Sequence, residues 1–137
     1  MSIAKDLAVV LGRLDYSETS QGLVLFTREH GKIRAIAKGI KRGTKTRFAV
    51  GIDLLDIGSV LFTSRVEKRE RLATITEWKQ SLGLSGLRDR LMRIQAGQYV
   101  AEITAGLTED RDPHAEVFDG LAATLHELAE AERVLPA

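Results

Sequence analysis

Five short apolar segments follow one another in the first 78 residues, and the connections between them are brief. The segments span residues 6–16, 22–28, 32–38, 52–63 and 71–78. The third and fifth alternate along the chain, as half-buried strands do. The first carries apolar side chains on both faces, and the second is almost continuously apolar. No crossover helix fits between the first three segments, so the sequence predicts a small five-stranded antiparallel barrel.

Two glycines mark places where this barrel must bend or turn. Gly12 lies inside the first segment, where we expect a bulge or a bend. Gly31 follows Glu29 and His30 in a short connection, and glycine adopts the positive φ that tight turns need. Segments 22–28 and 32–38 are therefore expected to form a hairpin.

The apolar periodicity becomes helical after residue 80. Apolar residues recur three and four positions apart over residues 84–107 and 113–133, which predicts two helices. Ser85 is the expected N-cap of the first helix, and Asp112 that of the second, with Pro113 at its first helical position. The short connection favours an antiparallel pair. We expect β followed by α, with a barrel over residues 1–80 and a helical subdomain over residues 81–137.

The formal net charge of +1 conceals two halves of opposite sign. Residues 1–80 carry 15 Lys and Arg against 9 Asp and Glu, whereas residues 81–137 carry 5 against 10. Residues 27–48 alone hold a single acid, Glu29, and eight basic side chains: Arg28, Lys32, Arg34, Lys38, Lys41, Arg42, Lys45 and Arg47. Because a strongly positive surface attracts polyanions, the first half is predicted to bind one.

These basic residues are expected to share one strand face and the connection after it. Ile33, Ala35 and Ala37 fall on one face of segment 32–38, and Lys32, Arg34, Ile36 and Lys38 fall on the other. Lys and Arg at this density supply the phosphate contacts that dominate nucleic-acid affinity. A solvent-facing strand is also often charged for solubility alone, and that interpretation stays open.

Two further groups of residues extend the predicted nucleic-acid site. A second basic patch contains Arg65 and Arg69 and is diluted by neighbouring acids. Aromatic residues make up 5% of the chain, so base stacking is limited to Tyr16, Phe48 and Trp78. The expected mode is therefore backbone contact with little sequence preference.

The sequence contains no complete motif for catalysis, metal binding or nucleotide binding. Residues 39–46 nearly match the sequence motif of a phosphate-binding loop. Thr44, however, occupies the position directly before the lysine, where that motif requires glycine. The chain has no cysteine, which excludes disulfides, thiol catalysis and cysteine-ligated zinc. Neither a membrane-spanning run nor a signal peptide is visible. We expect no catalytic residue, no metal, no cofactor, no small-molecule substrate and no membrane contact, and a cytoplasmic location.

The basic region also carries a family resemblance. Residues 25–39 (LFTREHGKIRAIAKG) resemble the N-terminal region of the bacterial recombination mediator RecO. Residues 15–20 (DYSETS), Lys41-Arg42, Arg47-Phe48, the bent segment to Phe62 and residues 72–77 (LATITE) fit the same pattern in order. The match covers most of residues 5–80 and is looser over the helices. Family members often carry a four-cysteine zinc module and further helices, which this sequence lacks.

The resemblance implies an OB-fold barrel followed by a helical domain. It also implies binding of single- and double-stranded DNA, strand annealing, and action with RecR, RecF and single-strand-binding protein to load a recombinase, in association with the nucleoid. By resemblance the DNA contacts are Lys32, Arg34, Lys38, Lys41, Arg42 and Arg47. The hypothesis is thus a non-catalytic DNA-binding recombination mediator. An RNA-binding OB module and an adaptor whose basic strip docks an acidic protein remain the alternatives.

Overall fold

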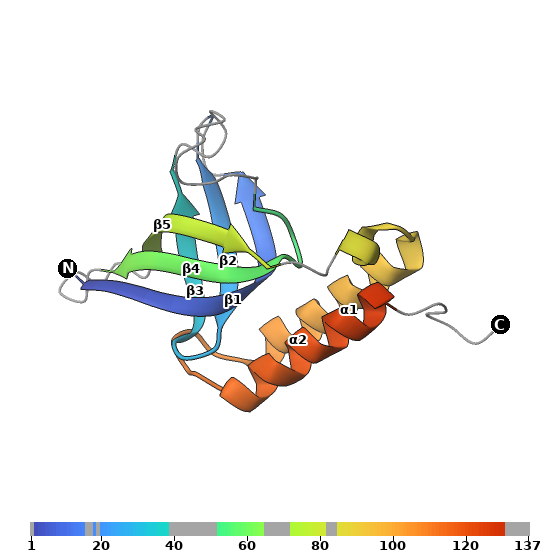
Figure 1. Cartoon of the computed structure of the whole chain (residues 1–137). Coiled ribbons are helices and arrows are strands. Elements are labelled where there is room, and N and C mark those ends of the chain that lie inside the picture. The colour runs from blue at the N-terminus through green and yellow to red at the C-terminus, as the bar shows by residue number, and fades with distance from the viewer. Residues whose placement is uncertain are drawn as a thin grey trace.

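The first half of the chain closes into a barrel of five strands, and two helices lie against one side of it (Figure 1). The computed structural model describes residues 2–15, 18, 20–38, 52–64, 72–81 and 85–130. The strands are β1 (Ser2–Asp15), β2 (Gln21–Thr27), β3 (Gly31–Ala37), β4 (Ile57–Ser64) and β5 (Leu72–Gln80). The helices are α1 (Leu91–Leu107) and α2 (Ala115–Glu130), preceded by a 3-10 turn at Ser85–Arg88.

The strands close in the order β1-β2-β3-β5-β4. This arrangement confirms the predicted OB-fold barrel with an appended helical pair, but the expectation of a wholly antiparallel barrel is wrong. β3 and β5 pair in parallel, with Arg34 opposite Leu72 and Ile36 opposite Thr74, while the other four pairings are antiparallel. Strand direction cannot alternate all the way round a ring of five, so one pairing has to be parallel.

β1 pairs with strands on both of its edges, β4 and β2, because it is long and bends. Its first part pairs with β4 from Ser2 to Val9, and its second part pairs with β2 from Ala8 to Asp15. The register against β2 shifts between Val10 and Gly12, which leaves one extra residue on β1, as in a β-bulge. The structure thus confirms the irregularity predicted at Gly12.

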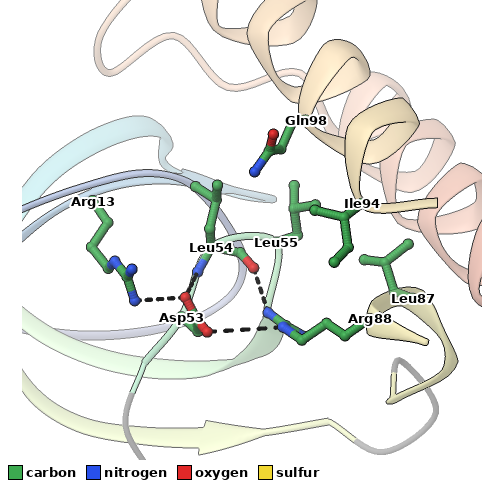
Figure 2. A pocket seen from close by; sticks show the side chains of 8 residues that line it. All are labelled: Arg13, Asp53, Leu54, Leu55, Leu87, Arg88, Ile94 and Gln98. Carbon is green, nitrogen blue, oxygen red and sulfur yellow. Dashed lines mark hydrogen bonds and ion pairs between the residues drawn. The ribbon is translucent and has the colours of Figure 1, made fainter. Parts of the chain in front are cut away.

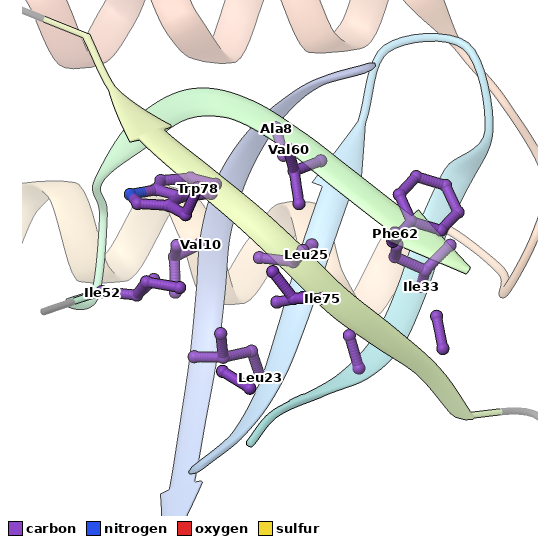
Figure 3. Close-up of a cluster of buried hydrophobic side chains, with 13 residues drawn as sticks. Ala8, Val10, Leu23, Leu25, Ile33, Ile52, Val60, Phe62, Ile75 and Trp78 are labelled. Atoms are coloured by element: carbon purple, nitrogen blue, oxygen red, sulfur yellow. The ribbon is translucent and has the colours of Figure 1, made fainter. Parts of the chain in front are cut away.

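The barrel interior is filled by alternate side chains from all five strands (Figure 3). Ile33, Ala35 and Ala37 point into it, as the alternation of β3 predicts. The indole of Trp78 also lies in this core, and the residue is only 4% exposed. Trp78 was a candidate for base stacking, and that prediction is wrong because its ring fills the barrel interior. The cluster comprises Ala8, Val10, Leu23, Leu25, Ile33, Ala35, Ala37, Ile52, Val60, Phe62, Ala73, Ile75 and Trp78.

A second apolar cluster joins the barrel to the helices. Phe26 of β2 packs against Phe118 of α2, with ring centroids 6.2 Å apart. The barrel adds Val9, Leu11, Leu55 and Ile57, and the helical part adds Leu87, Ala101, Leu121, Leu125 and Ala129. Burial of this apolar surface holds the two parts in one arrangement.

Both helices begin later than the sequence predicts. Residues Ser85–Arg88 form a 3-10 turn, and Arg90 is extended (φ −137°, ψ 136°), so α1 begins at Leu91 rather than at residue 84. The Arg90 position before α1 makes no side-chain cap, so the expected N-cap at Ser85 is wrong. α2 begins at Ala115, two residues after Pro113. In the part of the chain that the structure describes, no helix is long and apolar enough to cross a membrane.

Candidate nucleic-acid interface

Four of the ten predicted DNA-binding residues lie in the described structure, namely Arg28, Lys32, Arg34 and Lys38. The other six, Lys41, Arg42, Lys45, Arg47, Arg65 and Arg69, lie outside the described residues, as do the stacking candidates Tyr16 and Phe48. Arg28 lies in the β2–β3 turn, Lys32 and Arg34 lie in β3, and Lys38 directly follows β3. They fall into two groups, because one end of β3 lies against the helical subdomain and the other does not (Figure 1).

Lys32 lies at the helical end of β3, and its ammonium group binds the end of α1. The Nζ atom donates to the carbonyl oxygens of Ala105 and Thr108, each at 2.7 Å. Its side chain is only 12% exposed. The last carbonyls of a helix lack partners within the helix and carry partial negative charge, so a cation is stabilising there. Lys32 is therefore placed to cap α1.

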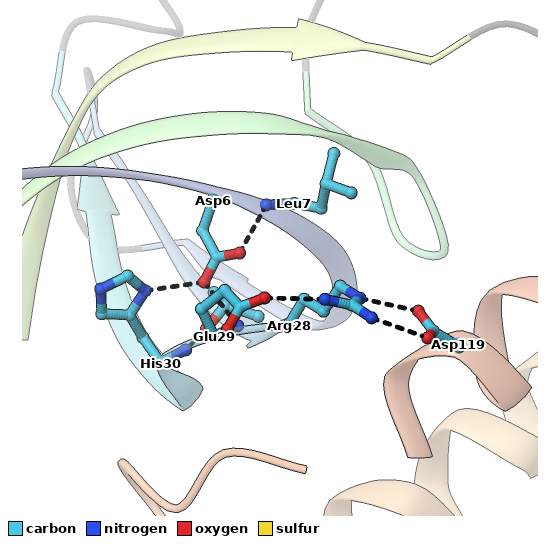
Figure 4. Close-up of polar contacts among 7 residues, drawn as sticks. Asp6, Leu7, Arg28, Glu29, His30 and Asp119 are labelled. Atoms are coloured by element: carbon cyan, nitrogen blue, oxygen red, sulfur yellow. Dashed lines mark hydrogen bonds and ion pairs between the residues drawn. The ribbon is translucent and has the colours of Figure 1, made fainter. Parts of the chain in front are cut away.

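Arg28 also faces the helices, at the turn between β2 and β3 (Figure 4). Its Nε and second terminal nitrogen donate to the two carboxylate oxygens of Asp119, at 2.9 and 3.0 Å. Its remaining terminal nitrogen donates to Glu29 at 2.7 Å. This pairing raises the pKa of the Arg28 guanidinium and lowers the pKa of the Asp119 carboxyl, chiefly through the side-chain hydrogen bond between them.

Arg34 is more loosely held. Its Nε donates to Asp110 at 3.4 Å, and its side chain is 58% exposed. Asp110 also approaches the ammonium group of Lys32 at 4.0 Å, so one carboxylate lies near both cations. The backbones of these two segments are also paired, since the Arg111 amide donates to the Lys32 carbonyl at 2.9 Å. The connection between α1 and α2 therefore lies alongside the start of β3.

Lys38 is the exception among the four. It follows the last residue of β3, and it is exposed. Within the described residues, Lys38 takes part in no ion pair, unlike Arg28 and Arg34. In the sequence it leads directly into the segment that holds Lys41, Arg42, Lys45 and Arg47. The far end of β3 thus carries an exposed cation, and the densest run of basic residues follows it in the sequence.

The hairpin turn between β2 and β3, at the opposite end of β3 from Lys38, is fixed by a buried acid. The side chain of Asp6 is 2% exposed, and its Oδ2 accepts from the Glu29 amide at 2.9 Å and lies 2.7 Å from His30 Nδ1 (Figure 4). Gly31 adopts φ +76°, which confirms the predicted turn glycine, and His30 lies in the turn as expected. A Cβ on Gly31 would lie 2.6 Å from the Asp112 backbone, so the turn also fits closely against the helical connection.

A groove between the barrel and α1 holds two more arginines (Figure 2). Asp53 accepts from Arg13 at 2.6 Å and lies 3.8 Å from Arg88. Arg88 also donates to the Leu54 carbonyl at 2.6 Å and to Asp56 at 3.1 Å. Burial raises the pKa of the Asp56 carboxyl, against the lowering effect of its hydrogen bond from the Asp53 amide and of the Arg88 charge. The arginines and carboxylates at this groove thus pair with one another.

Sequence reasoning missed the acids that neutralise the barrel cations. Asp110 and Asp119 lie 76 and 91 positions away from their arginine partners, so no local pattern connects them. The one signal in the sequence is the opposite net charge of the two halves, which favours their association. Among the described residues, no group of three or more His, Asp or Glu side chains could hold a metal ion.

Two family models match the chain, "Recombination protein O N terminal" over residues 1–82 and "Recombination protein O C terminal" over residues 88–137. The DNA repair protein RecO of Rhodopirellula baltica is 37% identical over 113 residues, which are 82% of this chain and 41% of that protein. The DNA repair protein RecO of Salinibacter ruber is 34% identical over 96% of this chain and 49% of its own length. That of Bacillus subtilis is 33% identical over 93% of this chain and 48% of its own length. The chain therefore spans about half the length, or less, of these curated relatives.

Proposed function

The chain belongs to the RecO family, and from this premise we propose that it binds the phosphate backbone of DNA at the far end of β3. The observation that carries the proposal is the exposure of Lys38 just before the basic residues Lys41 and Arg42. Phosphate contacts by Lys and Arg provide most of the sequence-independent affinity for DNA. In this proposal residues 1–80 supply the contacts, and residues 81–137 brace the barrel.

The cations at the two ends of β3 have different roles in this proposal. Lys32 is nearly buried and stabilises the end of α1, so it serves the fold. Arg28 and Arg34 are partly exposed but paired with acids, so their charge is partly neutralised. The positive charge of the predicted strip is therefore uneven along β3. We expect the strongest positive field where Lys38 leads into Lys41 and Arg42.

The cellular role follows from the family. We propose that the protein is a non-catalytic mediator of recombinational repair, which anneals complementary strands and helps to load a recombinase. Its proposed partners are RecR, RecF and single-strand-binding protein, and its proposed location is the cytoplasmic nucleoid. The support is the match of both family models and the names of the curated relatives, DNA repair protein RecO.

A pair of double variants tests the DNA site. Lys38→Glu combined with Arg42→Glu should weaken binding of labelled single-stranded DNA on the order of tenfold or more at low salt, because both changes remove phosphate contacts and add repulsion. Lys5→Glu combined with Lys79→Glu changes the net charge equally, at exposed residues of β1 and β5. The control should weaken binding much less, and equal losses in the two double variants would refute a site at the end of β3.

Competition with RNA separates DNA binding from the RNA alternative. A backbone-tracking DNA protein should release labelled DNA no more readily to RNA than to DNA of the same length and sequence. A module that reads RNA uses the 2′-hydroxyl and prefers the RNA competitor. Preference for RNA by tenfold or more would replace the DNA proposal with the RNA one.

A further inference from the structure

Arg28 is held by Asp119 in the geometry that arginine uses for phosphate. Two parallel N–H donors of one guanidinium meet both oxygens of one carboxylate, at 2.9 and 3.0 Å. Guanidinium groups bind carboxylates and phosphates through this same forked arrangement. The donors that would reach a DNA phosphate are therefore already engaged by an acid of the helical subdomain.

The pair lies at the surface and can be exchanged. The Arg28 side chain is 36% exposed and that of Asp119 is 56% exposed, so solvent reaches both partners (Figure 4). Exposed ion pairs contribute little to stability and are weakened by salt. Lys32 differs, because its side chain is 12% exposed and its ammonium group caps α1 from within the fold. Among these cations held by the helical subdomain, Arg28 is the better candidate for release.

We propose that Asp119 occupies Arg28 in place of a DNA phosphate and thereby limits the affinity of the barrel for DNA. This inference rests on the proposed function. It adds that Asp119 determines whether Arg28 belongs to the DNA site. While Asp119 is in place, it neutralises Arg28 and repels an approaching phosphate. DNA is then confined to the Lys38 end of β3, away from the helices.

The weaker Arg34 pair is consistent with the same arrangement. Asp110 accepts from Arg34 at 3.4 Å through one oxygen, and its other oxygen lies 4.0 Å from Lys32. Asp110 is shared between two cations, and only one hydrogen bond reaches Arg34. We therefore expect the removal of Asp110 to raise the affinity for DNA less than the removal of Asp119. The forked Asp119 pair is the sharper one to test.

The experiment compares Asp119→Asn with Glu127→Gln by fluorescence anisotropy on the full chain and labelled single-stranded DNA. Both changes remove one negative charge from an exposed residue of α2, but of these two acids only Asp119 pairs with Arg28, and the Glu29 pair of Arg28 is left unchanged in both variants. Asp119→Asn should bind DNA about threefold or more tighter than Glu127→Gln. Its log affinity against log salt should be steeper by about 0.7, the value expected for one added phosphate contact.

A second change assigns the gain to Arg28. Adding Arg28→Gln to the Asp119→Asn chain should abolish the gain, whereas Arg28→Gln alone should change affinity little. Because the amide oxygen of asparagine can still accept one hydrogen bond, Asp119→Ala, whose side chain has no acceptor, is tested beside it and should raise DNA affinity at least as much. Thermal unfolding of each variant checks that the fold is retained.

The outcomes separate this inference from the proposed function. If the parent chain binds DNA and Asp119→Asn behaves like Glu127→Gln, the masking role of Asp119 is refuted and the DNA proposal stands. If affinity rises equally with and without Arg28, the effect is a general loss of negative charge, and the inference is again refuted. If no chain binds DNA at low salt, both proposals fall together.

Discussion

At the scale of single residues, Lys32 couples the barrel to the helices by capping α1. The two carbonyl oxygens that it contacts belong to the last turn of α1 and its C-cap, where helical partners are absent. The cation also opposes the negative end of the helix dipole. A residue of a strand thus completes the hydrogen bonding of a helix that lies more than 70 positions away in the sequence.

Replacing Lys32 with methionine tests this role. Lys32→Met keeps the aliphatic stem and removes the donors, so we expect a loss of roughly 2 kcal/mol of unfolding free energy, as is typical for hydrogen bonds to a charged group. Lys38→Met, at an exposed position, should change stability by less than about 0.5 kcal/mol. Urea denaturation of both variants provides the comparison, and equal losses would show that the capping contacts do not stabilise the fold.

The alternation of β3 could be predicted from the sequence, but the surroundings of its outer face could not. Ile33 and Ala35 point inward as expected, because the period of two fixes which side chains share a face. Which cations face solvent depends instead on acids brought close by the fold. Nothing near Arg28 in the sequence indicates that Asp119 will bind it. The sequence equally favours Trp78 as a stacking residue, and its burial in the core follows only from the closure of the barrel around it.

At the scale of elements, the 3-10 turn before α1 is locked against the end of α2. Arg93 of α1 donates to the carbonyl oxygens of Gly86 and Ala129, at 2.9 and 3.1 Å. A Cβ on Gly86 would lie 2.2 Å from the Ala129 carbonyl oxygen, so only glycine fits without movement of the backbone. These contacts connect the start of α1, the turn before it and the end of α2.

Two glycine variants test how closely these elements pack. Gly86→Ala should lose about 2 kcal/mol or more of unfolding free energy, because backbone atoms must move apart to admit the methyl group. Gly120→Ala, on the open face of α2 with no atom near the added Cβ, should instead gain up to about 1 kcal/mol from helix propensity. The two free energies of unfolding come from matched denaturation curves. A gain in Gly86→Ala would contradict the close packing of the turn.

Helix position could be predicted more reliably than helix ends. Apolar residues at roughly helical spacing start at residue 84, although α1 begins only at Leu91. Docking of the 3-10 turn on α2 overrides the local pattern there, and such tertiary contacts leave no periodic trace. The parallel pairing of β3 with β5 was missed for a different reason, since it follows from closing an odd number of strands rather than from any residue.

At the scale of the whole molecule, a basic barrel and an acidic helical pair meet along one side. Their shared apolar cluster provides the main attraction, and the pairs Arg28–Asp119 and Arg34–Asp110 add charge complementarity at its edge. The helical pair thereby neutralises the barrel at one end of β3. We propose that DNA binds at the other end, where Lys38 precedes the basic segment in the sequence, so that the asymmetric charge of the sequence gives an asymmetric binding surface.

If the chain binds DNA through phosphate contacts, as we propose, its affinity for DNA must fall steeply as the salt concentration rises. Fluorescence anisotropy of the full chain with labelled single-stranded DNA is measured over a series of salt concentrations. We expect tight binding at low salt and a log–log slope of about −2 to −4, which corresponds to several phosphate contacts at roughly 0.7 each. Absence of binding at low salt, or an affinity that does not change with salt, would contradict it.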